Sequence, residues 1–274
     1  MTIDTFCTGD IVPFLKLAAA EEWLAEPWEF KFLLAEFSQG CFTARGDDAK
    51  AIGFVTSLRH ERSGWIGNLI VHPAYRGKGI GERLFKKVIE ALFDSGVETL
   101  WLTASKSGMP LYQKFGFTSI DTIIRWGGSG RQRSTGQEAA ATDKAVDALL
   151  NDIDSRAWGD RRDALVAVTA GRGMVLQEES GFVVVQQCEG FRQLGPFSAA
   201  GCGTADALLK AALNLIPVGI RVCLDAPASN RTALKLFNQN RMRISCSNEL
   251  MYAGVKPMYQ SEYIYGLSTM GSCG

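Results

Sequence analysis

Three glycines separate an apolar stretch from a long amphipathic one in the first half of this 274-residue chain. They are Gly77, Gly79 and Gly81, within the segment IGNLIVHPAYRGKGIGERLF. Glycine allows tight turns, so successive backbone N–H groups can point into one concavity, and a following helix adds the positive end of its dipole. Arg76 and Lys78 supply positive charge beside the turn, where charge-assisted hydrogen bonds are strongest. The pattern indicates a site for a diphosphate.

Two better-known phosphate motifs do not fit this segment. A Walker loop requires Gly-Lys followed by Ser or Thr, whereas Gly81 precedes Glu82. A dinucleotide fingerprint belongs on the first strand of a domain, but strand-like patterns at 41–45, 51–60 and 63–72 place this segment in the middle of one. An ordinary turn between strand and helix remains the alternative.

A second motif, LYQKFGF, follows about thirty residues after the glycines, at positions 111–117. Together the two motifs resemble those of the GNAT superfamily of N-acetyltransferases. Arg76, Gly79 and Gly81 match its coenzyme signature, and Tyr112, Gly116 and Phe117 match its second signature. The resemblance covers residues 3–126 strongly and the remainder faintly.

This resemblance implies acetyl-coenzyme A as the co-substrate. It implies that the strand holding residues 69–71 splays from its neighbour and pairs with the pantetheine arm, while a backbone N–H near Ile70 or Val71 polarises the acetyl carbonyl. The residues that it assigns to coenzyme binding are Leu69, Ile70, Val71, Arg76, Gly77, Lys78, Gly79, Ile80, Gly81, Glu82 and Ser105.

Direct transfer needs an acid for the leaving thiolate and a base for the amine. Tyr112 occupies the position where GNAT enzymes often carry the acid; the alternative is a tyrosine ring that only packs in the core. Glu22 is our candidate base, against the alternative of a solvated helix face. Asn68 offers a water relay, and His72 is read as structural. The aromatic residues at 23, 28, 30 and 32 form either core or an acceptor pocket.

The chain is long enough for two domains. The segment GGSGRQRSTGQEAAA lacks apolar periodicity and reads as a linker. We therefore predict a domain at 1–128, a linker at 129–141 and a second domain at 142–274. The order of predicted elements in the second half repeats that of the first, which indicates an internal duplication. The predicted fold is α/β, with a mainly antiparallel central sheet flanked by helices, in two tandem GNAT-like domains.

The repeated half keeps apolar residues and loses polar chemistry. When the halves are superposed by motif, Phe237 takes the place of Tyr112 and Asn230 that of Ser105. Gly201 and Gly203 remain, but without basic neighbours. We predict a non-catalytic second domain that either walls the acceptor pocket or mediates dimerisation, and a final segment, 263–274, that starts as a strand and ends as a loose tail.

Composition excludes several other classes. Lys plus Arg and Asp plus Glu both number 29, so no overall field favours nucleic acid. Apolar runs are too short to span a bilayer, and the first residues have no secretory pattern. Seven scattered cysteines and two histidines give neither a disulfide framework nor a metal site. We expect a cytoplasmic protein with no metal and no membrane or nucleic-acid partner.

The leading functional hypothesis is acetylation of the primary amine of a small molecule. Acetylation of a protein N-terminus or lysine is the neighbouring alternative. A binding module that senses acyl-coenzyme A without catalysis is the alternative from another class. A homodimer is left open.

Overall fold

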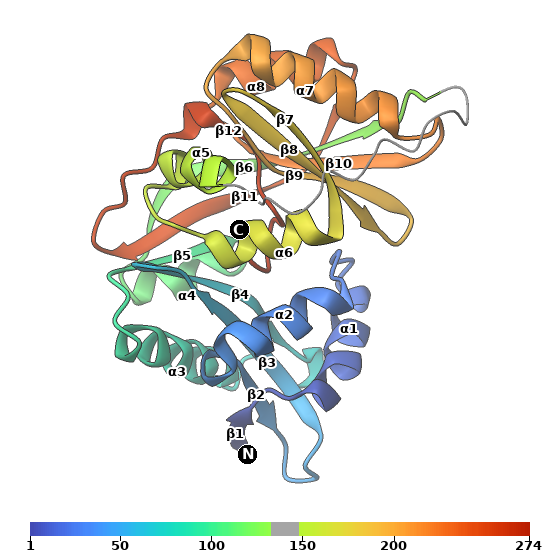
Figure 1. The fold of residues 1–274 in the computed structure, drawn as a ribbon. Coiled ribbons are helices and arrows are strands. Elements are labelled where there is room, and N and C mark those ends of the chain that lie inside the picture. The colour runs from blue at the N-terminus through green and yellow to red at the C-terminus, as the bar shows by residue number, and fades with distance from the viewer. Residues whose placement is uncertain (133–147) are drawn as a thin grey trace.

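The computed structural model describes residues 1–132 and 148–274, and both halves of the chain contribute to one continuous sheet (Figure 1). The elements of the first half are β1 (Thr2–Thr5), α1 (Ile11–Ala20), α2 (Pro27–Phe37), β2 (Phe42–Arg45), β3 (Ala51–Arg59), β4 (Ser63–Val71), α3 (Ile80–Asp94), β5 (Thr99–Ala104), α4 (Met109–Lys114) and β6 (Thr118–Ser129).

The second half begins with two helices and then repeats the order of strands and helices seen in the first half. Its elements are α5 (Ala148–Trp158), α6 (Asp163–Arg172), β7 (Gly173–Glu178), β8 (Gly181–Cys188), β9 (Phe191–Ala199), α7 (Cys202–Leu215), β10 (Arg221–Pro227), α8 (Arg231–Gln239), β11 (Arg243–Gly254) and β12 (Ile264–Gly266). Most of the predicted linker, 133–141, lies outside the described residues, as do the first residues of the second predicted domain.

Local sequence accounts for the boundaries of the helices around the site. Pro27 opens α2, where its fixed φ suits the first turn, and Glu26 and Glu29 form a reciprocal capping box. Gly79 caps α3 at φ 74°, and Leu84, Val88 and Leu92 then recur every fourth residue and are buried against the sheet.

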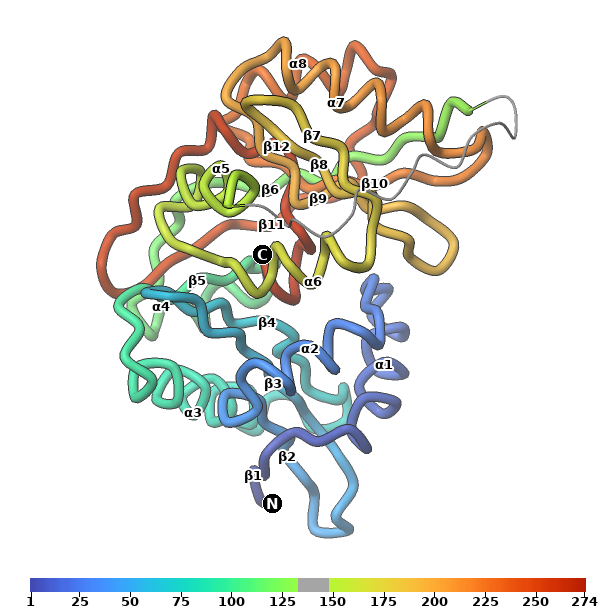
Figure 2. The backbone as a smooth tube through the Cα atoms, in the orientation of Figure 1, coloured from blue at the N-terminus to red at the C-terminus, as the bar shows by residue number. Residues whose placement is uncertain are grey.

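The two halves exchange their last long strands. The sheet runs in the order β1, β2, β3, β4, β5, β11, β6, β10, β9, β8, β7, with β12 pairing with β9. Strand β6 of the first half therefore lies between β10 and β11 of the second, and β11 lies between β5 and β6. Both views show the green β6 among the later strands (Figures 1 and 2). The antiparallel, helix-flanked sheet confirms the predicted fold class, whereas the division at residue 128 does not anticipate this exchange.

The interior is continuous across the halves as well. Trp158 at the end of α5 packs edge-on against Trp65 of β4 and Trp101 of β5, with ring centroids 6.1 and 5.7 Å apart. The same buried cluster reaches Leu267 and Met270 near the end of the chain. Apolar burial of this kind stabilises the halves against each other.

Asp160 fixes the loop after α5 to the turn between β3 and β4. Its carboxylate accepts hydrogen bonds from the backbone N–H groups of Arg62, Ser63 and Arg161 and from the Ser63 hydroxyl, at 2.6 to 3.2 Å. The residue is buried, so these donors have no ready alternative in water.

We expect Asp160→Ala to lower the free energy of unfolding by about 3 kcal/mol, because it leaves buried N–H groups unpaired. Denaturant titration followed by tryptophan fluorescence would measure this. The control is Asp152→Ala, which removes an exposed partner 3.6 Å from Arg161 and should change stability by less than about 0.5 kcal/mol. Equal effects of the two substitutions would contradict this account of Asp160.

The final segment is buried, contrary to the predicted loose tail. Leu267, Ser268 and Cys273 are fully buried, and Gln186 donates to the Ser268 carbonyl at 2.9 Å. The strand-like start is confirmed as β12. Apolar residues inside this short Gly- and Ser-rich stretch explain why it is held in the interior.

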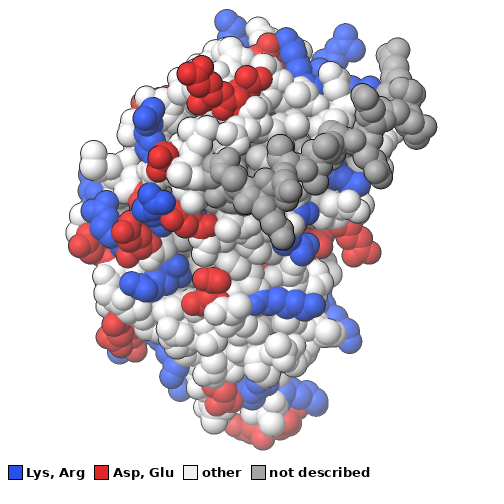
Figure 3. All heavy atoms as spheres, viewed as in Figure 1, with Lys and Arg blue, Asp and Glu red and all other residues white. Residues whose placement is uncertain are grey.

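The described surface carries charges of both signs. Lys, Arg, Asp and Glu side chains are interspersed on the face in Figure 3. Among the described residues, no helix combines the length and hydropathy that crossing a membrane requires.

Candidate functional site

A cleft of about 760 Å³ opens between the two halves. One end is built by the first half alone, from the end of β4, the glycine turn and α4. The other end is built jointly by α2, β6, β8, β9, β11 and residues 268–272. Ten of the eleven predicted coenzyme contacts line the cleft, together with Tyr112 and Glu22.

The two strands at the first end separate as predicted. β4 and β5 pair in parallel only over Ser63, Gly64 and Trp65. A bulge follows, with Asn68 at φ 57° and a shift in the register between β4 and β3. Beyond it, β4 is paired on its β3 side only, so the main-chain groups on its other side face the opening.

The glycine turn leaves its backbone donors free. Gly77 and Gly79 adopt φ values of 75° and 74°, and a side chain at either position would meet nothing within 4 Å. Within the described chain, the N–H groups of residues 77–79 donate to no backbone acceptor. Three adjacent free donors at the start of α3 form the concavity expected for a diphosphate.

The two basic side chains of this turn behave differently. Arg76 lines the cleft, where its Nε donates to the Val71 carbonyl at 2.9 Å and its Nη2 binds Glu21. Lys78 does not line the cleft; its Nζ lies 5.1 Å from the centre of the Tyr75 ring. Arg76 is therefore the basic group in place at the rim, and Lys78 is turned aside.

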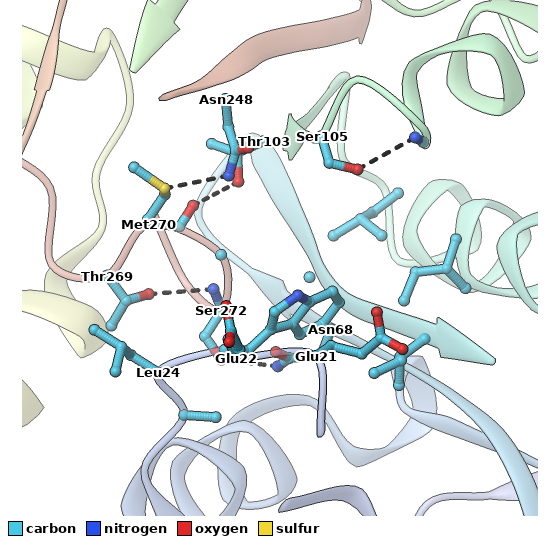
Figure 4. A pocket seen from close by; sticks show the side chains of 18 of the residues that line it. Glu21, Glu22, Leu24, Asn68, Thr103, Ser105, Asn248, Thr269, Met270 and Ser272 are labelled. Carbon is cyan, nitrogen blue, oxygen red and sulfur yellow. Dashed lines mark hydrogen bonds between the residues drawn. The ribbon is translucent and has the colours of Figure 1, made fainter. Parts of the chain in front are cut away.

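Tyr112 combines a core contact with exposure to the cleft. Its ring packs against Phe85, with 4.8 Å between the ring centroids. The core packing expected under the alternative to an acid role is therefore present. Burial raises the pKa of its hydroxyl to about 12. The group therefore keeps its proton throughout the neutral range. Ser105 lies nearby and accepts from the Gly108 N–H at 3.2 Å (Figure 4).

Glu22 stands at the mouth of the cleft. It follows α1 in the left-handed conformation, at φ 59°, and is exposed beside Trp23 and Leu24. Of the predicted aromatic cluster, Trp23 and Trp28 line the cleft while Phe30 and Phe32 are core. Asn68 is buried rather than facing solvent, because its amide donates to Thr56 and to Ser272.

The deeper end holds a group of polar side chains that the sequence did not reveal. Arg125 of β6 is bonded through its Nε and Nη2 to both oxygens of Asp225, at 2.7 and 2.8 Å, and Gln193 donates to the same carboxylate. Glu26 accepts from the backbone of Glu189 at 2.9 Å. The Arg125–Asp225 and Glu26–Glu189 contacts join residues 100 and 163 positions apart, and the first depends on the strand exchange that places β6 beside β10.

Glu29 is the most unusual of these groups. It is only 4% exposed, yet it lines the cleft. Burial is the main cause that raises the pKa of its carboxyl to about 7, opposed by hydrogen bonds from Ser272 and from the Glu26 backbone. A signal existed in the sequence, since an acid three residues after Glu26 and inside the aromatic run WEFKF suggests a cap that faces inward.

The second half has a splay of its own, and the chain itself fills it. β9 and β10 pair only over residues 221–223 of β10. Beyond this, β12 pairs with β9, and the Leu267 N–H donates to the Asp225 carbonyl at 2.8 Å. Asn230, the counterpart of Ser105, donates to the Ile264 carbonyl at 2.9 Å. We call residues 264–272 the strap, because the same segment continues to the first splay.

At the first splay, the strap reaches the bulge in β4. The carbonyl oxygens of Gly271 and Ser272 lie 2.4 and 2.7 Å from where a side chain on Gly67 would be, so only glycine permits this approach. Thr103 of β5 donates to the Met270 carbonyl (Figure 4). The strap thus occupies the narrow part of the splay and leaves the wider part open.

In the second half, the counterparts of Tyr112 and of the glycine turn do not repeat the predicted chemistry. Phe237 is fully buried against Trp126. Gly201 has φ −167°, an extended conformation, so the glycine turn is not repeated. Among the described residues no cluster of side chains is arranged to hold a metal ion.

Comparison with known proteins gives two matches to family models. Residues 11–117 match the acetyltransferase (GNAT) family, and residues 150–266 match an acetyltransferase (GNAT) domain. A crystal structure from Pyrococcus horikoshii, titled as that of a putative acetyltransferase, has the same fold, with TM-score 0.84 and 24% identity over 98% of this chain and 95% of that one.

Curated relatives match the first half. A ribosomal protein bS18 alanine N-acetyltransferase of Haemophilus influenzae is 35% identical over 77 residues, which are 27% of this chain and 53% of that protein. An N-alpha-acetyltransferase of Arabidopsis thaliana is 29% identical over 122 residues, 41% of this chain and 64% of that protein. The chain thus spans roughly half to two thirds of the length of these relatives.

Proposed function

Because this chain belongs to the GNAT acetyltransferase family, with one domain of that kind in each half, we propose that it transfers an acetyl group from acetyl-coenzyme A to the primary amine of a small molecule. The single observation that carries this proposal is the shared cleft. It joins a built diphosphate cradle, an open strand edge and a polar chamber in one continuous space.

The residues of the first end fit the coenzyme. The free N–H groups of residues 77–79 and the start of α3 would hold its diphosphate, with Arg76 at the rim. The repeat supports a role for Ser105. Its counterpart Asn230 binds the strap in the second splay, and the pantetheine arm would take the corresponding place in the first.

The strand register refines the predicted contacts with β4. The His72 N–H donates to the Ile52 carbonyl, and Ile70 pairs with Phe54. Alternate residues of a strand direct their main-chain groups to the same side. The groups of Ile70 therefore face β3, and those of Leu69 and Val71 face the splay. Of the two expected donors to the acetyl carbonyl, Val71 is favoured.

The second end fits a cationic amine of limited size. Glu26 and Glu29 line it and Glu22 stands at the mouth, while the charge of Arg125 is matched by Asp225. This excess of carboxylates attracts an ammonium group. Residues of β8, β9, β11 and the strap add walls to this end of the cleft, which favours a small acceptor in this proposal. The second domain is thus proposed to wall the acceptor site and not to catalyse transfer.

A panel of acceptors tests the proposal. The purified protein is incubated with acetyl-coenzyme A and small diamines, amino acid esters, or peptides with free N-termini, and thiol release and product mass are measured. We expect turnover with small amines. Turnover with peptides alone would favour protein N-termini, which the names of the curated relatives suggest for those proteins. Coenzyme binding without thiol release would indicate a non-catalytic sensor.

A further inference from the structure

The Glu29 carboxyl is an ionisable group placed inside the acceptor chamber and largely hidden from water. It projects from the first turn of α2 and lines the cleft. One of its oxygens, Oε1, accepts from the Glu26 N–H at 3.0 Å. Helix capping explains that one contact. It does not explain why the carboxyl is buried beside the cavity, because burying an uncompensated charge is costly.

Ser272 of the strap links Glu29 to the splay. Its side chain lies beside the Glu29 carboxyl and favours the ionised form. The Ser272 Oγ also accepts from the Asn68 amide at 2.8 Å, and Asn68 forms the bulge in β4 (Figure 4). Because the Oγ already accepts from Asn68, its own proton is available to Glu29. The carboxyl is thereby oriented relative to the point where β4 and β5 separate.

The charges around Glu29 balance between its two protonation states. Burial and the neighbouring Glu26 favour the neutral acid, whereas Ser272, the Glu26 N–H and Arg125 favour the carboxylate; the result is a pKa of about 7. Cys188 and Cys273 also face this carboxyl, and burial raises the pKa of each thiol, so both stay neutral. A group poised in this way can both take and release a proton near neutral pH.

We propose that Glu29 is the general base of the reaction, taking a proton from the acceptor's ammonium group in the cleft, and that Ser272 is its positioning residue. This inference rests on the proposed function. Glu22, the base predicted from the sequence, is exposed at the mouth of the cleft and has no comparable support. In this proposal Glu29 takes its place.

In this reaction the acceptor's ammonium loses one proton to the Glu29 carboxylate, directly or through one water, and becomes a neutral amine. The amine lone pair forms the C–N bond at the thioester carbonyl, and the C–S bond then breaks with its electron pair on sulfur. The second amine proton leaves nitrogen, and the thiolate takes a proton from Tyr112, which regains one from that nitrogen or from solvent. Glu29 releases its proton to water.

The main test compares Glu29→Gln with the wild type. Glutamine keeps an oxygen that accepts from the Glu26 N–H, so α2 keeps its cap. We expect kcat at pH 7.5 to fall about 100-fold, and the rise of kcat with pH near pH 7 to disappear, since the base works only when ionised. The affinity for acetyl-coenzyme A, measured by calorimetry, should stay within twofold. The matched control is Glu36→Gln, an exposed acid on the same helix that does not line the cleft, with unchanged kcat.

An acceptor analogue separates chemistry from structure. With an amine that is already neutral at pH 7.5, such as an alkoxyamine (R–O–NH2) analogue of the best acceptor, the defect of Glu29→Gln should shrink below about fivefold, because no base is needed. Ser272→Ala should lower kcat about tenfold and shift the limb near pH 7 without removing it. A defect of the same size with both acceptors would overturn the catalytic role.

Thermal unfolding gives a readout independent of activity. A raised carboxyl pKa means that the native state binds more protons than the unfolded state between about pH 4.5 and 7. The stability of the wild type relative to Glu29→Gln should therefore decrease as the pH rises through that window.

If the wild type releases thiol while Glu29→Gln stays within fivefold of it, Glu29 is not the base and the proposed function stands. If the wild type releases none with any amine, both fail.

Discussion

Tyr112→Phe is expected to lower kcat about 100-fold at neutral pH, because the thiolate loses its proton donor while the ring stays in place. The burial that raises the pKa of this hydroxyl to about 12 keeps it protonated across the assay range. Donation by Tyr112 therefore should produce no loss of activity below about pH 10. Steady-state thiol release from pH 6 to pH 10 would measure both effects.

The phenyl ring should retain the contact with Phe85, so the affinity for acetyl-coenzyme A and the melting temperature are expected to change little. Tyr252→Phe serves as the control, since Tyr252 packs on Trp101 and does not line the cleft. A Tyr112→Phe enzyme within twofold of the wild type would remove the acid from the mechanism and leave solvent to protonate the thiolate.

The double substitution Gly77→Ala/Gly79→Ala is expected to weaken coenzyme A binding about 100-fold. Both glycines have φ values near 75°, and an L-residue there costs roughly 1–2 kcal/mol. The free turn can relax to avoid this strain, whereas the bound turn must direct all its N–H groups at the diphosphate. Titration calorimetry with coenzyme A measures the loss directly.

Backbone strain alone must be separated from the loss of the cradle. Gly96 and Gly219 also have positive φ values, 88° and 91°, with open space around them, and neither lines the cleft. Gly96→Ala/Gly219→Ala should therefore cost similar stability and leave coenzyme affinity unchanged. If both double variants bind coenzyme equally well, residues 77–79 are not the diphosphate site.

What could be predicted from the sequence is the part set by local pattern. The bounds of β3, β4, α3 and β5 follow from apolar periodicity and from glycine or capping residues at their ends. The glycine turn and Tyr112 were found because their chemistry is contained within short motifs. These features depend on neighbours in sequence, which a reader of the chain can see.

The remainder depends on which strands become neighbours. Alternation of apolar and polar residues predicts that 118–126 and 243–253 form strands. It does not specify which strands they pair with, because any neighbouring strand with one apolar face is compatible with this pattern. Neither the exchange of β6 and β11 nor the pairing of Arg125 with Asp225 follows from it. The same reason hid the strap, whose backbone packs against Gly67 and whose Ser272 reaches Asn68 across 204 positions.

The exchange of β6 and β11 makes the two copies of the duplicated unit structurally dependent on each other. Each copy places one strand in the sheet of the other, so deleting either copy would leave the remaining one with an unpaired strand edge and without a wall of the cleft. A cut near residue 128 cannot recover an ancestral single-copy enzyme. The second copy, which we propose is non-catalytic, therefore supplies a strand and cleft walls on which the first copy depends.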